Sequence, residues 1–285
     1  MGCNWQRTVL ATAVCTVSLS VHFPPCFAQS TPPPKTSQGP PAVEPRLKSH
    51  DSVTVTAQLT PEENEDWKIN QIFEPVFFLE QKRDCDGAVR RYQTEVIPLA
   101  EKSKFEVPKN KFLFLANRGI GECLMKQGHY EQAEQSFQKA MEYLPIWPGI
   151  DDSDYPVSFQ QIAMAQMGQE HWEAAEGSLK RSVSLLDPRI TKAIQSSDPL
   201  IRSEEGGVLS GEKARSLAYL AIVYLREGRT RESLETADLA YTQATLPGVP
   251  PAVLAGVADI GRSIAQASGN EDAIAKWAHA GTTQK

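Results

Sequence analysis

The chain has few of the features that mark enzymes, metal proteins or membrane proteins. It lacks a G-x-S-x-G nucleophile motif, a Walker-type phosphate loop, an H-E-x-x-H zinc motif and any paired-cysteine metal pattern. After residue 28 it has no long apolar run, so the rest of the chain is expected to be soluble. These absences predict a protein that is not an enzyme and that uses no cofactor, metal or small-molecule substrate.

Charge of either sign is not concentrated anywhere. The 285 residues contain 29 Lys and Arg against 35 Asp and Glu, a formal net charge of −6. Nucleic-acid binding depends on a basic surface with stacking aromatic residues, and neither forms a cluster, so such a partner is not expected. We interpret His129 and His171 as solvated turn residues, and the acidic run at 151–154 as a solvated loop rather than a calcium site.

The N-terminus has the pattern of an export signal. Arg7 precedes an uncharged, moderately apolar run from Val9 to Phe23, and small residues, Cys26 and Ala28, stand where a signal peptidase would cleave after residue 28. The run is short for a membrane span, but retention as an anchor stays open as an alternative. The sequence thus predicts a signal peptide at 1–28 and, from its proline-rich composition, a disordered linker at 29–59.

What the chain does contain is a recurring order of small and aromatic residues. The clearest copy has a turn at Gly128, a small residue at Ala133, an aromatic at Phe137 and a proline at Pro145. This order is typical of a helical hairpin that stacks on copies of itself. It resembles the tetratricopeptide repeat family, in which a small residue of the first helix, here Gly121, packs against Ala133 at the helix crossing.

Other copies depart from this pattern at single positions. Glu170 replaces the turn glycine, Ser233 replaces the contact alanine, and Gly269 comes one position late. The resemblance implies an all-α, TPR-like solenoid of four helix-turn-helix hairpins, with a weaker fifth hairpin before them. HEAT-type repeats and a single four-helix bundle are alternatives that the internal spacing disfavours. The contact positions of the five copies are Ala88, Ala133, Ala175, Ser233 and Ala273.

The repeat domain is predicted to span 60–280, with a disordered tail at 281–285. It begins at a helix start in which Thr60 is the cap, Pro61 holds the first helical position and Glu63 completes a capping box. The extra length between hairpins is expected in two connections, 146–155 and 189–211. A proline at 188 is expected to end the helix before the second connection.

The chain has few cysteines, and their positions decide whether a disulfide can form. Three of the five cysteines fall within the predicted signal, which leaves Cys85 and Cys123 in an oxidising compartment. In the repeat register Cys85 opens the second helix of the weak first hairpin, and Cys123 lies on the first helix of the next. A disulfide between them is a candidate, with free thiols as the alternative, because sequence does not give the geometry.

The first helices of such hairpins are expected to line a concave groove. Arginines and methionines on these helices could bind an extended or helical peptide that carries acidic groups. The alternatives are that the methionines are buried between hairpins and that the arginines are ordinary solvated residues. The candidate groove residues are Arg118, Glu122, Lys126, Met164, Met167, Arg215, Ile222, Arg226 and Arg262.

The sequence therefore predicts an exported scaffold, periplasmic or secreted, that binds a protein or peptide partner. An accessory subunit of an envelope polysaccharide or transport complex is the alternative. The lysine and asparagine pair that forms the carboxylate clamp of chaperone-binding family members is not reproduced here, so that specificity is not expected.

Overall fold

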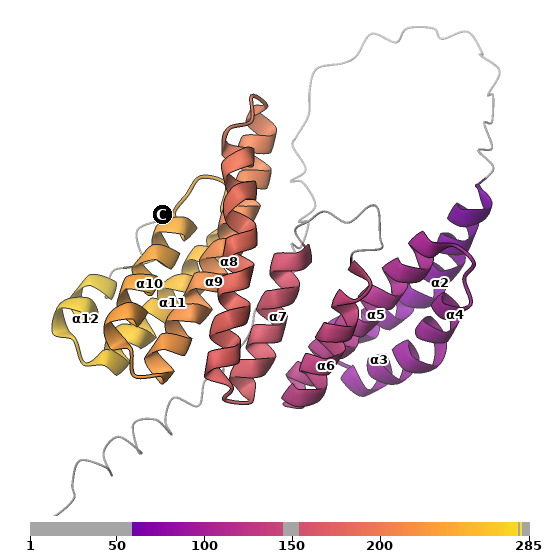
Figure 1. Cartoon of the computed structure of the whole chain (residues 1–285), viewed down its shortest axis with the longest axis horizontal. Helices are drawn as coiled ribbons and strands as arrows, with labels where there is room; N and C mark the ends of the chain where they lie inside the picture. The colour runs from indigo at the N-terminus through magenta and orange to yellow at the C-terminus, as the bar shows by residue number, and fades with distance from the viewer. Residues whose placement is uncertain (1–58, 145–153, 279, 281–285) are drawn as a thin grey trace, which may run out of the picture. The chain divides into compact units, whose positions relative to one another are not determined.

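A computed structural model describes residues 59–144, 154–278 and 280 of the chain (Figure 1). Within these residues every regular element is a helix. The predicted signal peptide, all but the last residue of the predicted linker, Pro145 and the tail at 281–285 lie outside the described residues, as does most of the predicted connection at 146–155.

The helices follow one another with short turns between most of them. Two short π-helical segments, η1 and η3, interrupt or precede longer α-helices. The elements are α2 (Pro61–Gln81), α3 (Cys85–Arg91), η1 (Tyr92–Val96), α4 (Ile97–Glu101), α5 (Glu106–Lys126), α6 (Tyr130–Met141), α7 (Asp154–Gly168), α8 (Trp172–Ile194), η3 (Ile201–Glu205), α9 (Gly206–Arg226), α10 (Thr230–Ala244), α11 (Pro251–Ser268) and α12 (Glu271–Trp277).

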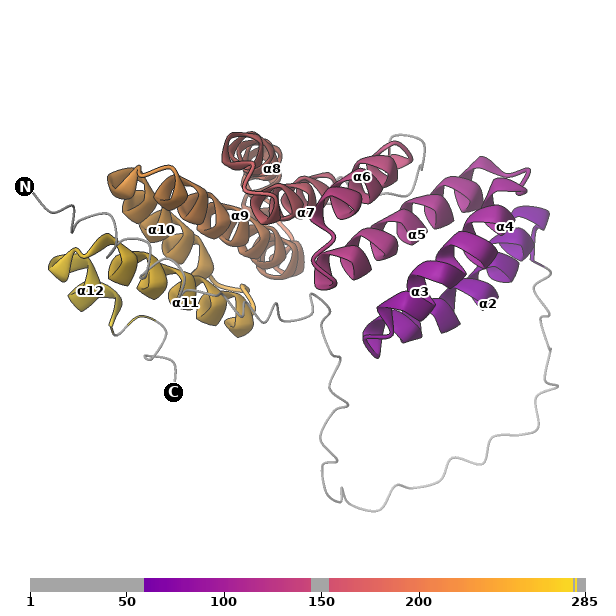
Figure 2. The same cartoon turned by 90° about the horizontal axis from the view of Figure 1, so that it is seen from below.

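The described helices form five hairpins. α2 packs against α3 and η1, and the later pairs are α5 with α6, α7 with α8, α9 with α10 and α11 with α12 (Figure 2). Each second helix also packs against the first helix of the next hairpin from α6 onward, which is the stacking that a repeat array uses to bury its apolar surface. The four predicted hairpins are confirmed, and the weaker fifth one is present at the N-terminal end.

The first described helix starts as the sequence predicts. The Thr60 hydroxyl accepts a hydrogen bond from the Glu63 amide at 3.2 Å, and the Glu63 carboxylate accepts one from the Thr60 amide at 2.7 Å. Pro61 holds the first helical position, where its missing N–H removes no helical hydrogen bond. The capping box is therefore formed.

The turns inside the hairpins need a left-handed residue. Gly128 and Gly228 supply it, with φ near +80° in both. In the α7–α8 turn the same conformation falls on Glu170, whose φ is +61°. A side chain disfavours this region by about 1–2 kcal/mol, so this turn is strained where the glycine turns are not. The α2–α3 turn has the same feature at Arg83, whose φ is +65°.

Close packing of two helices depends on a small residue facing a ring. A Cβ atom placed on Gly121 of α5 would lie 2.5 Å from the ring of Phe137 on α6, and one on Gly261 of α11 would lie 2.2 Å from the ring of Trp277 on α12. The expected contact of Gly121 with Ala133 stays a prediction; the side chain that lies closest to the space beside Gly121 is Phe137. A planar aromatic side chain fills the space that glycine leaves.

The connection predicted at 189–211 is mostly helix. α8 continues through Pro188 to Ile194, and α9 already begins at Gly206. The reason is that Leu186, Ile190 and Leu209 form a small buried cluster between the two helices, so that each helix gains apolar burial by continuing. Pro188 is exposed, and it does not end the helix as predicted. Figure 1 shows α8 and α9 as a long hairpin.

Ser233 is well accommodated at its contact position. It is fully buried, and its hydroxyl donates a hydrogen bond of 2.6 Å to the carbonyl of Ala221 on the neighbouring helix. The hydroxyl that replaces the alanine methyl of the other hairpins is therefore satisfied, and it links α10 to α9.

We predict opposite effects of alanine at two helical glycines. Gly121→Ala should lower stability by about 1–3 kcal/mol, because the new methyl overlaps the Phe137 ring and the helices must separate. Gly177→Ala, in α8 with open space around it, should raise stability by up to about 1 kcal/mol through helix propensity. Urea unfolding followed by circular dichroism measures both. A Gly121→Ala variant at least as stable as Gly177→Ala would contradict the close contact.

Candidate functional site

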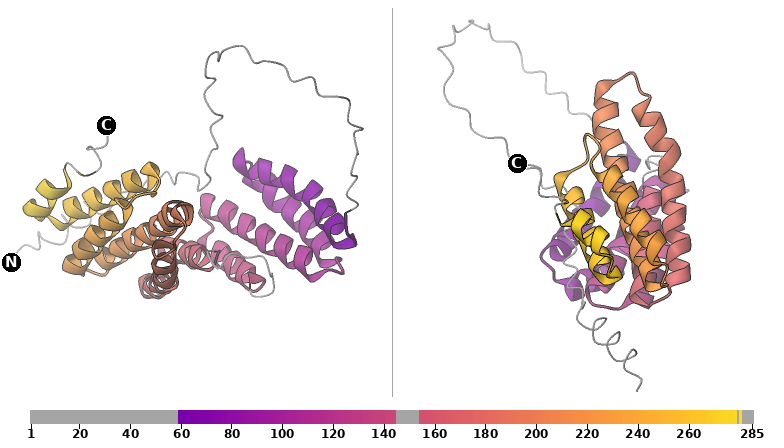
Figure 3. Two further views of the ribbon diagram at one scale, coloured as in Figure 1. Left: turned by 90° about the horizontal axis from the view of Figure 1, so that it is seen from above. Right: turned by 90° about the vertical axis from the view of Figure 1, so that its left-hand side faces the viewer.

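The first helices of the four later hairpins form one continuous surface. Gln161 of α7 donates a hydrogen bond of 2.9 Å to Glu122 of α5, and Gln160 of α7 donates one of 2.7 Å to the hydroxyl of Ser216 on α9. α11 packs directly against α9. We call the surface formed by α5, α7, α9 and α11 the first-helix face; these helices can be followed in Figure 3. All the predicted groove residues lie on these four helices.

On α5 the predicted charges are engaged with acids of the same chain. The Arg118 guanidinium lies 3.8 Å from Glu122 and 3.7 Å from Asp154 of α7, and it also stacks over the Phe114 ring. Arg118 and Glu122 are both half-buried. The ion pair between Arg118 and Asp154 therefore joins two neighbouring hairpins, and the pair between Arg118 and Glu122 lies within α5.

Lys126 belongs to a polar cluster around Glu80 that the sequence did not predict. Its ammonium lies 3.5 Å from the carboxyl of Glu80, which is 2 % exposed on α2. The Tyr92 hydroxyl donates to the other oxygen of the same carboxyl at 3.3 Å. Lys126 itself is exposed. No short-range pattern in the sequence marks Glu80, because Lys126 and Tyr92 come from other helices.

Burial, with a smaller contribution from the nearby Glu122 carboxylate, raises the pKa of Glu80 to about 8. Lys126 lowers it only in part. A buried carboxyl group without full compensation takes up a proton rather than hold a charge in an apolar surrounding. At neutral pH the protonated Glu80 can donate a hydrogen bond to Glu122.

The two methionines of the face differ in their surroundings. Met167 packs against the buried cluster of Ala175 and Leu179, so that it is part of the hairpin core more than of a binding surface. Met164 is half-buried on the same helix. The alternative of burial between hairpins thus describes Met167, and Met164 is the methionine of this pair that suits apolar contact with a partner.

On α9 and α11 most cations are again paired within the chain. Arg215 binds Glu212, and Arg262 binds Asp259 and donates to the carbonyl of Ala280 at 2.6 Å. Ile222 packs partly into the cluster that holds Trp277. These contacts fix the side chains and lower their net charge toward any partner.

Arg226 is the exposed cation of α9. Its guanidinium stacks over the Trp172 ring of α8 at 5.8 Å from the ring centroid. It stands two residues before the turn glycine of its hairpin, and Lys126 stands at the same place in the α5–α6 hairpin. The first-helix face therefore presents two exposed positive groups at equivalent repeat positions.

A buried hydrogen-bond network lies beneath this surface. The Ser182 hydroxyl of α8 donates to the carbonyl of Pro156 on α7 at 2.8 Å and lies 2.9 Å from the Ser216 hydroxyl of α9. Gln160 donates to the same Ser216 hydroxyl. The network connects three helices at one point, and all its side chains are buried.

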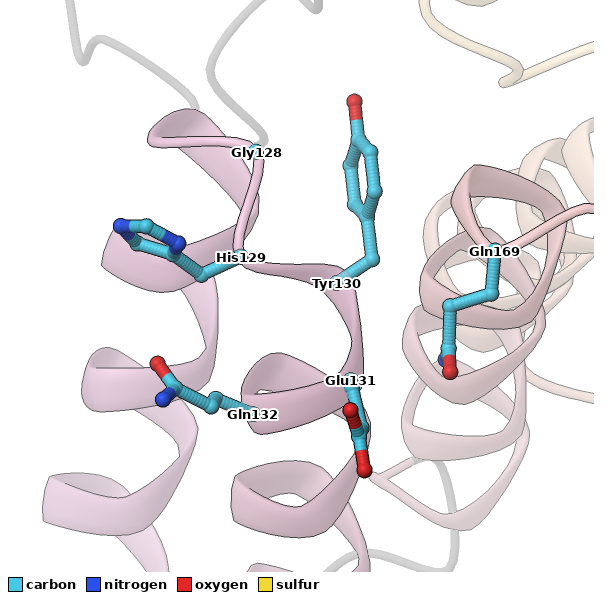
Figure 4. Close-up of a pocket in the computed structure, with 6 residues that line it drawn as sticks. All are labelled: Gly128, His129, Tyr130, Glu131, Gln132 and Gln169. Carbon is cyan, nitrogen blue, oxygen red and sulfur yellow. The ribbon is translucent and has the colours of Figure 1, made fainter.

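A shallow pocket lies at the turns of the second and third hairpins. It has a volume of about 340 Å³, and Figure 4 shows Tyr130 between its own helix and Gln169. Polar side chains line it, and the ring of Tyr130 covers Gly168, where a Cβ would lie 2.5 Å from the ring. The lining residues are Gly128, His129, Tyr130, Glu131, Gln132 and Gln169.

The two remaining cysteines lie close together in the first core cluster. Both are buried free thiols, Cys85 at the start of α3 and Cys123 on α5. Burial raises the pKa of the Cys123 thiol, and a hydrogen bond with Cys85 raises it further. The predicted placement on facing helices is therefore observed, and the disulfide itself stays a prediction.

Residues 59–144, 154–278 and 280 contain neither a candidate membrane span nor a candidate metal site. None of the helices there combines the length and the apolar character that a membrane crossing requires. In the same residues no group of three or more His, Cys, Asp or Glu side chains is arranged to hold a metal ion.

Comparison with known proteins supports the repeat fold. Residues 114–146, which cover the end of α5 and α6, match the Tetratricopeptide repeat family. The chain folds as a TPR-like α-solenoid. The comparison with curated proteins gives no match.

Two solved structures with TPR-like arrangements illustrate the likeness in fold. A protein of Podosopora anserina assigned as a kinesin light chain, with nearly identical TPR-like repeats, is 16% identical and has a TM-score of 0.54; the match covers 76% of this chain and 94% of that one. BtubC (BKLC) from P. vanneervenii is 14% identical with a TM-score of 0.55, and the match covers 79% and 91%. At this identity the solenoids share a fold.

We predict that Glu80→Gln stabilises the protein more at high pH than at low pH. The folded pKa of Glu80 is raised, so its protonated form favours folding below about pH 4.5, and this advantage is lost as pH rises to about 8. Glutamine keeps the shape without the charge. The melting temperature of Glu80→Gln relative to the parent should rise by more than about 2 °C between pH 5 and pH 8.

Glu131→Gln is the matched control for this experiment, since it removes one exposed carboxylate from α6. Its difference from the parent should stay constant between the two pH values. A Glu80→Gln difference that also stays constant would mean that Glu80 is ionised in the folded protein throughout this range.

For the cysteines we predict that material exported into an oxidising compartment contains the Cys85–Cys123 bridge. Thiol counting in denaturant without reductant should then find no free thiol in the mature chain, and reduction should release two. The loop closed between the two residues is long enough for a stabilisation of about 2–4 kcal/mol. Two thiols before reduction would refute the bridge.

Proposed function

We propose that the chain is a scaffold that binds a protein partner on its first-helix face. The observation that carries the proposal is the continuity of this surface, in which hydrogen bonds connect α5 to α7 and α7 to α9, and α11 packs onto α9. A surface held in this way spans several hairpins and is already ordered before a partner arrives, which reduces the entropic cost of binding.

The exposed groups of this face suit a partner that carries both acidic and apolar side chains. Lys126 and Arg226 are exposed cations at equivalent repeat positions, and the half-buried Met164 lies on α7 between their two helices. Cations of the face that bind an ionised acid of the chain contribute less, because a partner must compete with that acid. The acid beside Lys126 is Glu80, which is protonated at neutral pH and therefore competes little for the ammonium. Binding is thus expected to depend on Lys126 and Arg226 more than on Arg215 or Arg262.

We further propose that the protein is exported and acts in the periplasm or outside the cell. The support is the sequence pattern of the N-terminus, with its apolar run and the small residues before position 29. Cell fractionation followed by N-terminal sequencing tests it. Mature protein that starts at Gln29 in the exported fraction supports the proposal, and a cytoplasmic protein with its N-terminus intact refutes it.

Site-specific photo-cross-linking tests the binding face. A photoreactive amino acid at Met164 or Arg226 should give a cross-link to one defined partner in the native cell fraction, which mass spectrometry can identify. The same amino acid at Leu239 or Arg231, both exposed on the second helix α10, is the matched control and should give none. Cross-links at the control positions alone would place binding elsewhere.

The identified partner then allows the charges to be tested directly. Lys126→Gln combined with Arg226→Gln should weaken binding of the purified partner by at least about tenfold and reduce its salt dependence. Arg231→Gln removes an arginine that is 90% exposed on α10 and should leave the affinity unchanged. Equal affinities for all three proteins would show that the face does not bind through these cations.

A further inference from the structure

The two exposed cations of the first-helix face differ in what lies beneath them. The guanidinium of Arg226 stacks over the Trp172 ring, at 5.8 Å from its centroid. The ammonium of Lys126 lies 3.5 Å from the carboxyl of Glu80, and the Lys126 side chain is 47% exposed whereas that of Glu80 is 3% exposed. The contact thus connects a surface position on α5 with a carboxyl group in the interior of the first hairpin.

The surroundings of Glu80 disfavour a charge on its carboxyl group. The exposed Lys126 contacts one carboxyl oxygen, and the Tyr92 hydroxyl donates to the other at 3.3 Å. The carboxyl of Glu122 is within hydrogen-bonding distance of Glu80, and Gln161 of α7 donates to Glu122 at 2.9 Å. Two adjacent carboxyl groups ionise together only at a cost in free energy, and the buried one of such a pair holds the proton. Glu80 is therefore the neutral member of the pair in neutral solution.

Three elements pack against α2 and bring other titratable groups near Glu80. Burial raises the pKa of the Tyr92 hydroxyl and of the Cys123 thiol, so neither loses its proton near pH 8. Burial also raises the pKa of Glu80 to about 8. The carboxyl that contacts Lys126 therefore changes its charge around this pH. The titratable groups around it are Tyr92 of η1, Glu122, Cys123 and Lys126 of α5, and Cys85 of α3, which hydrogen-bonds with Cys123.

The charge of Glu80 decides how strongly Lys126 attracts a partner. While Glu80 is neutral, the charge of the ammonium is not compensated, and it can bind a carboxylate of a partner. Once Glu80 is ionised, it competes for the same ammonium and repels that carboxylate. We propose that Glu80 is a positioning residue for Lys126 and makes the α5 end of the first-helix face bind acidic groups more strongly in neutral than in alkaline solution. The part of this proposal that concerns a partner rests on the function proposed above.

Trace acetylation of the full chain with acetic anhydride tests the control of Lys126 by Glu80 without any partner. The reagent reacts with the neutral amine, whereas an ionised Glu80 stabilises the ammonium form. The yield at Lys126, divided by the yield at the exposed Lys139 of α6, should fall by about two- to fivefold between pH 6.5 and pH 9.5. Mass spectrometry of the digested chain measures both yields.

Glu80→Gln is the decisive variant, because glutamine keeps the shape of the side chain and carries no charge. The yield ratio of this variant should be the same at both pH values. Glu131→Gln removes one exposed carboxylate from α6 and is the matched control, in which the ratio should fall as it does in the parent. A ratio that does not change with pH in the parent would overturn the proposal, and so would an equal fall in Glu80→Gln.

The partner identified by the photo-cross-link at Met164 or Arg226 tests the consequence for binding. Between pH 6.5 and pH 9, its affinity for the parent should fall by at least about threefold more than its affinity for Glu80→Gln. An equal fall for both proteins would overturn the role of Glu80 in binding. Cross-links at the control positions alone would refute the proposed function instead, and the acetylation profile would still decide whether Glu80 controls Lys126.

Discussion

The distance between the two helices of a hairpin is the constraint on which the rest of this structure depends. It is set where a residue without a side chain meets a ring, as Gly121 meets Phe137 and Gly261 meets Trp277. Because the helices approach closely there, the second helix can also reach the first helix of the next hairpin and bury its apolar side. Where the α9–α10 hairpin has Ser233 in place of alanine, a hydrogen bond between the two helices keeps them together.

The fold could be predicted from the sequence because hairpin geometry is a local property. The turn glycines, the contact alanines and the capping box at Thr60 each act within one or two helical turns, and each predicted hairpin is present. The path of the chain after Pro188 could not be predicted in this way. There α8 continues because Leu186 and Ile190 meet Leu209, a residue about twenty positions later, and this distant burial outweighs the cost of an exposed proline.

The helices that carry the candidate groove residues could be predicted from the sequence, whereas the ion pairs of those residues could not. Counting along each first helix placed Arg118, Lys126 and the later arginines on the correct helices. The same counting could not show that Arg118, Lys126 and Arg215 form ion pairs with Asp154, Glu80 and Glu212. Asp154 and Glu80 come from other helices, and the side-chain rotamers that form the ion pairs depend on packing. Of the five predicted cations, Arg118 and Lys126 pair with acids of another hairpin, whereas Arg215 and Arg262 pair with acids of their own helix.

The buried network of Gln160, Ser182 and Ser216 has a consequence for how similar hairpins find their correct neighbours. Repeats that share one pattern can dock on the wrong copy during folding, since apolar surfaces fit one another with little discrimination. A hairpin that docked in place of α7–α8 would deprive the buried Ser216 hydroxyl of α9 of its bonds with Gln160 and Ser182, and a buried polar group that loses its partner costs about 1–3 kcal/mol. The network therefore disfavours docking of the wrong hairpin beside α9. In the native order of hairpins, every buried hydroxyl and amide of this network has a hydrogen-bond partner.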